Sequence, residues 1–551
     1  MFKYKNCILL GILLFFLTFS FYPTVYEIRQ SPRLKVKNRN FILEHNYYWP
    51  DFNLYLSKVR QGYENRWLAV EKYTSEPHRG SLIQIFYLYM GKIGMSLGLQ
   101  PNIAYQLGRI ILSPLLLIVI LMLVQYYFRA PLWQILAFVI TLVSGSFLKI
   151  SRIDGTLRLE RFMEWWSNID SLQRITFIPH ILFGQVISFY LLFRITLSKN
   201  PLKKSRLLIY IILANLVGLV FPPSLITLLG VLILLQIIEF IKNPKHVSQK
   251  VNLLLSSPEL RFILFSLPSL LYLYITTKII PWSALVEFHR THPMMIPFDQ
   301  YVLGTGPVIF LGFLAGILAI ISKEKRFYPM ILWVVVTFLF AALFSVVKEQ
   351  SPLRFTQTGL FIPLGILGTY FMYRLAGVIN LNFYRYLIFF LIVLYIGSNL
   401  FVMKMSLNWQ LSFINQRVGA DIPAVPYPPQ TMYPLTEWMD AIIWLKNNTG
   451  NEDVVLAEIT AGNFIPAYSG NFVYFGQSNT VDYNRKGDEV NRFFTAQMTD
   501  SQAGIFLRNG RIGYVFFGVQ EKEKLGWKNL EEYYPFLKPV FKNNSVVIYR
   551  I

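Results

Sequence analysis

The stretch from residue 45 to residue 80 carries most of the side chains that could do chemistry. It reads HNYYWPDFNLYLSKVRQGYENRWLAVEKYTSEPHRG, with acids and bases set among aromatic residues. A stretch of this length that only connected two elements would be unusual. Its candidate site residues are Asp51, Tyr55, Arg60, Glu76 and His78.

The candidate catalytic group is Asp51. A carboxylate held near a substrate can accept a proton from an acceptor hydroxyl or orient that hydroxyl. The pattern of WPDFNLYLSKVRQG predicts a helix with Asp51 at or near its N-terminus. An acid in that position also caps a helix, so a structural role for Asp51 is the alternative.

Four further side chains could contact a substrate. Arg354, in KEQSPLRFTQTG, could clamp an anionic group through two hydrogen bonds, or it could reach the membrane interface as a snorkelling arginine. His180, in FIPHILFG, could bond an anionic or hydroxyl group, or could be structural. Arg152 and Asp154 lie in SRIDGTLRLERF, whose pattern predicts an amphipathic surface helix.

The sequence contains few devices for binding a metal or a nucleotide. Two Asp residues never stand one residue apart, so the D-x-D motif of nucleotide-sugar enzymes is absent, and no G-x-G-x-x-G or P-loop follows a predicted strand. The spacing of His289 and His292 resembles a metal pair only superficially. No cofactor is predicted, and a divalent cation bound through oxygen atoms near Asp51 stays open.

These candidates must be positioned by a chain that is largely apolar. Hydrophobic residues make up 54% of its 551 residues and charged residues 15%, against about 25% in soluble domains. Apolar runs without internal charges recur between Cys7 and Met405, and a helix needs about 20 such residues to cross a bilayer. We predict eleven membrane-spanning helices at residues 6–22, 103–128, 131–149, 176–197, 205–221, 224–242, 260–281, 301–322, 329–347, 359–378 and 387–405.

The distribution of Lys and Arg predicts the topology. The first run follows Lys3 and Lys5 but lacks a small-x-small cleavage site, so we interpret it as a retained helix rather than a signal peptide. Residues 81–99 include Lys92 and several glycines, and we expect them to lie on the membrane surface. With these assignments, most Lys and Arg residues lie in loops on the same side of the membrane as the N-terminus. Because positive loops face the cytoplasm, this distribution predicts a cytoplasmic N-terminus. These loops account for the net charge of +22, so the charge does not indicate that the protein binds nucleic acid.

The predicted domains follow from the same pattern. Residues 1–405 form the transmembrane domain, with outer loops at 23–102 and 150–175, and the Pro-rich residues 406–434 form a linker. Residues 435–551 alternate between predicted strands such as IGYVFFG and predicted helices such as LTEWMDAIIWLKNN. This alternation indicates a small soluble α/β domain on the outer face.

The arrangement of motifs after the first helix resembles the C-type (GT-C) glycosyltransferase superfamily. The resemblance rests on Asp51 followed by Tyr55, on Arg60 with Gly62, and on Trp67. The stretch EPHRGSLIQIFY is similar to the surface helix of protein O-mannosyltransferases and lipid A aminoarabinose transferases, and NIAYQLGRIILSPLL is similar to their second crossing.

The resemblance implies a multi-pass enzyme whose active site faces outward and whose donor is a polyprenyl-phosphate-linked sugar. It implies that Asp51 is the catalytic carboxylate. Many relatives have a second acid beside that position, whereas Asp51 stands between Pro50 and Phe52. Glu76 or Asp154 are the candidates for a second acid.

We therefore predict a glycosyltransferase of the cell membrane that transfers a sugar from a polyprenyl-phosphate carrier to a lipid, glycan or protein acceptor on the outer face. A transporter or flippase of a lipid-linked saccharide is an alternative, although such proteins usually show internal repeats. A non-catalytic assembly protein is a third alternative. The polar first loop argues against it, because such a protein would not need that loop. Partners are the lipid-linked donor, the acceptor and the membrane, without nucleic acid.

Overall fold

The structure, a computed structural model, describes residues 5–43, 45, 49–162, 170–197, 204–242, 257–378, 382–419 and 433–551. The chain divides into two compact units. Unit 1 comprises Met1–Tyr22, Arg109–Leu273 and His292–Trp409, and unit 2 comprises Pro23–Gly108, Tyr274–Thr291 and Gln410–Ile551. The polar first loop and the C-terminal α/β region therefore belong to the same unit.

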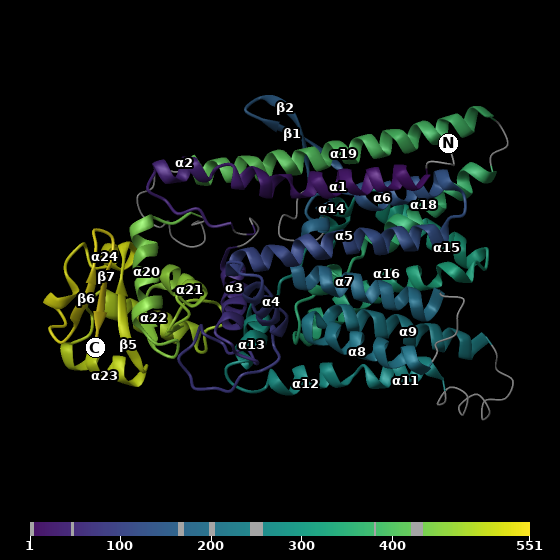
Figure 1. Cartoon of the computed structure of the whole chain (residues 1–551). Coiled ribbons are helices and arrows are strands. Elements are labelled where there is room, and N and C mark those ends of the chain that lie inside the picture. The colour runs from purple at the N-terminus through teal and green to yellow at the C-terminus, as the bar shows by residue number, and fades with distance from the viewer. Residues whose placement is uncertain are drawn as a thin grey trace. The chain divides into compact units, whose positions relative to one another are not determined.

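Unit 1 is built mainly of apolar helices (Figure 1). Proline occupies the first or second position of several of them, where its missing N–H has no helical partner in any case. The helices within this unit are α6 Pro131–Val143, α7 Pro179–Leu192, α8 Lys204–Val220, α9 Pro222–Lys242, α11 Pro258–Phe265, α14 Phe298–Thr305, α15 Val308–Ile321, α16 Tyr328–Val347, α17 Leu353–Thr356 and α18 Phe361–Val378, with short turns at η2 Arg174–Thr176, η3 Phe193–Leu197 and η4 Lys325–Phe327.

Four more helices contribute residues to both units: α1 Lys5–Ile28, α5 Pro101–Tyr127, α12 Pro268–Thr276 and α19 Asn382–Gly419. Because α19 continues to Gly419, the first part of the predicted linker at 406–434 is helical, and residues 420–432 lie outside the described residues.

Each of the eleven predicted crossings overlaps a helix of the structure. Among the described residues, seven helices are long and apolar enough to cross a membrane, and the pair α14 and α15, bent by 91°, would make eight. Two shorter apolar helices, Pro131–Val143 and Arg206–Val220, accompany them. The protein is thus a mostly helical, multi-pass membrane protein, and the count of eleven stays a prediction.

The predicted amphipathic helix around Arg152 is wrong, because this segment forms a β-hairpin. Strand β1 Leu148–Ile153 pairs antiparallel with β2 Thr156–Arg161. The two turn residues, Asp154 and Gly155, have φ values of +49° and +76°. Asp-Gly favours the two-residue turn that needs positive φ at both positions, and this local signal outweighs the helical spacing of the apolar residues.

Unit 2 contains a five-stranded mixed sheet in the order β4-β3-β5-β7-β6 (Figure 1). Strand β3 runs parallel to β4 and β5, and β7 is antiparallel to β5 and β6. The strands are β3 Val454–Leu456, β4 Phe472–Val473, β5 Ile512–Phe517, β6 Lys538–Lys542 and β7 Val547–Arg550.

Helices cover both faces of this sheet, because successive strand residues point to opposite sides. Val455 and Phe516 contact the core formed by α20 and α21, whereas Leu456 and Val515 contact the core formed by α22 and α23. The helices of this region are α20 Thr436–Asn448, α21 Ile459–Tyr468, α22 Tyr483–Phe494, α23 Asp500–Asn509 and α24 Val519–Lys524, with η5 Leu530–Glu532.

The first loop adds three helices to unit 2 and joins its core, and a later loop adds a fourth helix. Its helices are α2 Ser31–Val36, α3 Trp49–Tyr63 and α4 Ile85–Ser96, and α13 Ser283–Thr291 comes from a later loop. Leu54 and Tyr73 of the first loop are buried in the same cluster as Trp438 and Phe464. The backbone N–H of Val473 in the edge strand β4 donates to the carbonyl of Lys72 at 2.9 Å. The first loop therefore completes the α/β region.

Candidate functional site

The predicted site residues divide between the two units. Asp51, Tyr55, Arg60, Glu76 and His78 belong to unit 2. The others, Arg152, Asp154, His180 and Arg354, belong to unit 1.

Helix α3 carries Asp51 in its first turn, with the side chain half-buried. A negative charge at this end of a helix is favoured by the helix dipole, typically by about 0.3–1 kcal/mol. The next residue, Phe52, is buried against Tyr105, whose ring centroid lies 5.0 Å away. The backbone at Asp51 is therefore held by packing of its neighbour.

Buried polar contacts anchor α3 further along its length. The Asn53 side chain donates to the Asn463 amide oxygen at 2.8 Å. The Lys58 ammonium donates to the Glu71 carboxylate at 3.1 Å and to the Val70 carbonyl at 2.6 Å. Burial lowers the pKa of Lys58, and Glu71 opposes this shift by stabilising the charged form. A buried pair of this kind is costly to break, so it fixes the position of the helix.

Tyr55 lies on the aromatic side of α3 and not in an open site. Its ring is buried and stacks on Tyr87 of α4, with centroids 4.5 Å apart. Tyr87 stacks in turn on Tyr105, which contacts the Nδ1 atom of His45 through its hydroxyl at 3.0 Å. In the described structure Tyr55 therefore helps to join α3 to α4.

Arg60 belongs to a cluster of ion pairs around Glu64. The Glu64 carboxylate lies 3.5 Å from Arg60 and 2.6 Å from Lys72. Lys72 also donates to the carbonyl of Gly470. Burial lowers the pKa of Lys72 to about 8, with Glu64 opposing the shift. The cluster connects the first loop to the α/β region.

His78 is held by two backbone contacts. Its Nε2 atom accepts the N–H of Glu71 at 2.8 Å, and its Nδ1 atom lies 2.7 Å from the carbonyl of Glu76. Because a carbonyl can only accept, these partners assign the proton to Nδ1 in a neutral ring. Burial lowers the pKa of His78, in agreement with the neutral form. This arrangement makes His78 a structural connector of the loop.

Glu76 forms an ion pair with Lys486 of α22, at 2.6 Å, and accepts a hydrogen bond from Thr74. Burial lowers the pKa of Lys486, and Glu76 opposes that shift. The Lys486 ammonium also lies 4.6 Å from the centre of the Tyr474 ring. The Glu76 carboxylate is therefore paired with a cation of the α/β region, Lys486.

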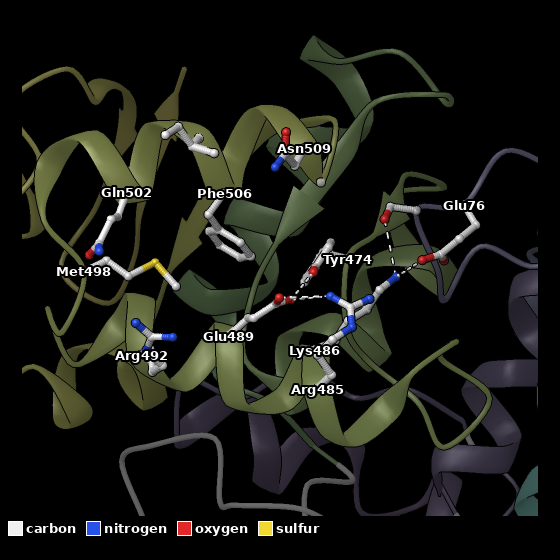
Figure 2. Close-up of a pocket in the computed structure, with 13 residues that line it drawn as sticks. Glu76, Tyr474, Arg485, Lys486, Glu489, Arg492, Met498, Gln502, Phe506 and Asn509 are labelled. Carbon is white, nitrogen blue, oxygen red and sulfur yellow. Dashed lines mark hydrogen bonds and ion pairs between the residues drawn. The ribbon is translucent and has the colours of Figure 1, made fainter.

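Two cavities meet at the Ser75–Glu76 segment. The first, of about 440 Å³, lies between this segment and helices α22 and α23 (Figure 2). The second, also about 440 Å³, lies between the same segment and the loops around Asp453, Phe472 and Arg511. Volumes of this size are typical of small-ligand sites.

In unit 1, Arg354 and His180 are neighbours. Arg354 lies in α17 and donates to the side chain of Gln357 at 3.3 Å. The backbone carbonyl of Gln357 accepts from Gln185 of α7 at 2.7 Å. The guanidinium of Arg354 is close enough to His180, the second residue of α7, to act on it electrostatically.

Two further arginines near the start of α7 were missed by the sequence reasoning. Arg174, fully buried, lies 4.8 Å from the centre of the Phe361 ring and donates to the Ser144 carbonyl. Burial lowers its pKa to about 10, so Arg174 stays charged at neutral pH. Arg109, also buried, donates to the Thr176 carbonyl at 2.9 Å. The available signal was Arg109 itself, which lies near the start of the predicted crossing 103–128, just before its charge-free run from residue 110 onward, since a charge in a membrane-spanning segment often marks a functional region.

Arg152 and Asp154 lie at the tip of the β-hairpin and are exposed. The φ of +49° at Asp154 gives this residue a conformational role in the turn. In the part of the chain that the structure describes, no three side chains of His, Cys, Asp or Glu come together as a metal site.

No protein-family model and no curated protein sequence matches this chain. Solved structures do match it. The oligosaccharyltransferase of Archaeoglobus fulgidus, tethered to an acceptor peptide, matches 92% of this chain and 69% of its own, with a TM-score of 0.55 and 12% identity. The same enzyme in complex with an inhibitory peptide and a dolichol-phosphate matches 91% of this chain and 69% of its own, with a TM-score of 0.51 and 13% identity.

A third similar structure is the arabinofuranosyltransferase AftD from mycobacteria. It matches 98% of this chain and 40% of its own, with a TM-score of 0.50 and 14% identity. The likeness extends over almost the whole chain in each case, so it includes both units. The chain therefore has the fold of the C-type membrane glycosyltransferases, the superfamily that its first-loop motifs resemble.

Proposed function

We propose that this protein is a membrane glycosyltransferase that moves a sugar from a polyprenyl-phosphate carrier to an acceptor on the outer face. The observation that carries the proposal is the fold, shared over 91–92% of the chain with an oligosaccharyltransferase that was solved with a dolichol-phosphate. A fold alone hosts many functions, so the polar first loop is the second support.

The proposed reaction forms one bond and breaks one. The acceptor oxygen attacks the anomeric carbon, the bond from that carbon to the phosphate oxygen breaks, and the phosphate leaves with the electron pair. Asp51 accepts the proton of the acceptor group as its oxygen becomes bonded to the sugar. Its place at the start of a firmly held helix suits this role, since a catalytic group must be kept in position.

The leaving phosphate gains negative charge during such a reaction, which a cation would stabilise. Arg354 is the candidate in unit 1, because its guanidinium has a neutral amide partner, Gln357, and no ion pair with a carboxylate among the described residues. A planar guanidinium can bind two phosphate oxygens at once.

The test is Asp51→Asn in the full-length protein, reconstituted in nanodiscs and supplied with polyprenyl-phosphate sugars and cell-envelope acceptors. Asn keeps the size of Asp and its ability to hydrogen-bond, and it loses only the interaction of the charge with the helix dipole, about 0.3–1 kcal/mol. We expect transfer to fall about 10²- to 10⁴-fold, the usual contribution of a general base, while the free energy of unfolding falls by no more than about 1 kcal/mol.

The matched control is Asp440→Asn, which changes an exposed carboxylate on α20 of the same unit. It should leave transfer at the level of the unmodified protein. Full transfer by a folded Asp51→Asn protein would remove Asp51 from the mechanism. Lipid movement across the bilayer without sugar transfer would favour a transporter instead.

A further inference from the structure

We propose that the two cavities at the Ser75–Glu76 segment bind an acidic saccharide chain, with its acidic sugar in the first cavity. The inference rests on the proposed function, because it names the class of acceptor or growing product that the enzyme holds. It assigns a binding role to the α/β region.

The first cavity offers a mixed apolar and polar lining. Figure 2 shows Arg485, Glu489 and Arg492 along α22, opposite Gln502 and Phe506 of α23. The spacing of the three α22 residues, i, i+4 and i+7, places them on one face of that helix. Planar polar groups beside aromatic rings suit a ligand with many hydroxyls and apolar C–H faces.

Most charges in the first cavity are already neutralised. Lys486 pairs with Glu76 at 2.6 Å, and Arg485 pairs with Glu489 at 2.9 Å. Arg492, exposed on the same helix, makes no salt bridge with a described carboxylate. Arg485 is also paired with Asp482, at 3.1 Å. Arg492 is therefore the one cation of the first-cavity lining without a carboxylate partner among the described residues, and it is available to bind a single anionic group.

The charges of the second cavity balance. Glu452 pairs with Arg66, and His78 is neutral in its backbone contacts. The remaining lining charges are Asp453, whose carboxylate accepts the Gly450 N–H at 2.8 Å, and Arg511. We therefore assign the second cavity to an adjacent neutral part of the same chain.

The structure favours a saccharide over an extended peptide. Peptides commonly bind by adding a strand to a free sheet edge. Strand β4 is the sheet edge beside the second cavity, but its Val473 N–H is already bonded to the Lys72 carbonyl. A ligand in these cavities must instead be held by side chains.

The test measures direct binding to the full-length protein in nanodiscs by calorimetry. The probes are tetragalacturonate, its neutral methyl ester and the acidic peptide tetraglutamate. Because the acid can form a charge-assisted hydrogen bond with Arg492 that its neutral ester cannot form, we expect the acid to bind at least about tenfold more tightly than its ester. Arg492→Gln should abolish this preference, and Arg508→Gln, an exposed cation of α23 outside the lining, should retain it.

Three outcomes with the saccharide probes would overturn the inference: no binding of tetragalacturonate, equal affinity for acid and ester, or a preference that survives Arg492→Gln. Tighter binding of tetraglutamate than of tetragalacturonate would overturn it in favour of a peptide ligand. Binding by the Asp51→Asn protein separates the two proposals. Retained saccharide binding with lost transfer supports both, whereas retained transfer with retained binding removes only the role of Asp51.

Discussion

At the scale of single residues, the polar side chains of the first loop have different roles, and these roles could not be predicted from residue type alone. His78 and Arg60 bind groups within unit 2 and connect parts of the fold. Asp51 sits in the first turn of α3. A residue type predicts what chemistry is available, and the partners decide whether it is used for structure or for a substrate.

Glu521 provides a prediction at this scale. It is fully buried, and burial, together with Glu458, raises its pKa from 4.5 to about 7. Between these pH values the folded protein keeps the proton that the unfolded chain releases. The free energy of unfolding should therefore fall as the pH rises from about 4.5 to 7, by up to about 3 kcal/mol, and level off above pH 7.

The measurement is urea-dependent proteolysis of the α/β region in the full-length protein between pH 5 and pH 8. Glu521→Gln should reduce this pH dependence, and Glu523→Gln, an exposed acid of the same helix, should keep it. An unchanged slope in the Glu521→Gln protein would show that another group titrates.

At the scale of elements, two helices of unit 2 approach each other through glycines. A Cβ atom at Gly91 of α4 would overlap the Val59 carbonyl of α3, and one at Gly62 would overlap the Leu88 carbonyl. The missing side chains therefore allow the backbones of α3 and α4 to touch. This contact sets where α3, and with it Asp51, can lie.

We predict that Gly91→Ala destabilises unit 2 by about 1–3 kcal/mol, the usual cost of overpacking a close interface. Transfer activity should fall as well, because α3 must move. Thermal unfolding and the transfer assay measure the two effects. Gly504→Ala is the control, since a Cβ at this helical glycine meets no atom within 4 Å. Equal stability of the two variants would argue against a tight α3–α4 contact.

At the scale of the whole molecule, unit 2 is assembled from three separate parts of the sequence. The first loop and the α/β region share one hydrophobic cluster, the hydrogen bond from Lys72 to the Gly470 carbonyl and the ion pair of Glu76 with Lys486. They should therefore unfold as one cooperative unit, although more than 300 residues separate them in the chain.

The variant Lys72→Met tests this expectation. It removes the contacts to Glu64 and to the Gly470 carbonyl, and we expect a loss of about 1–3 kcal/mol. Hydrogen exchange on the full-length protein should show faster exchange in α3 and in α21 together. Lys446→Met, at an exposed position of α20, should change neither. Faster exchange in only one of the two segments would contradict a shared unit.

The sequence by itself determined the membrane class of the protein and the approximate positions of the apolar helices that the structure describes, because crossing a bilayer requires long runs of apolar residues. It also indicated the GT-C fold, through motifs in the first loop, and most strands of the α/β region, through alternating apolar residues. These signals are local, so they can be detected within a window of some twenty residues or fewer.

Only the tertiary structure decided which distant residues meet. The pairs of Glu76 with Lys486 and of Asn53 with Asn463 join segments about 400 residues apart, and no local pattern marks such partners. The Asp154–Gly155 turn shows the same limit at short range, since helical spacing and turn preference competed and the turn prevailed. Long-range contacts depend on how whole elements pack, because each close contact forms only when both backbones are already in place.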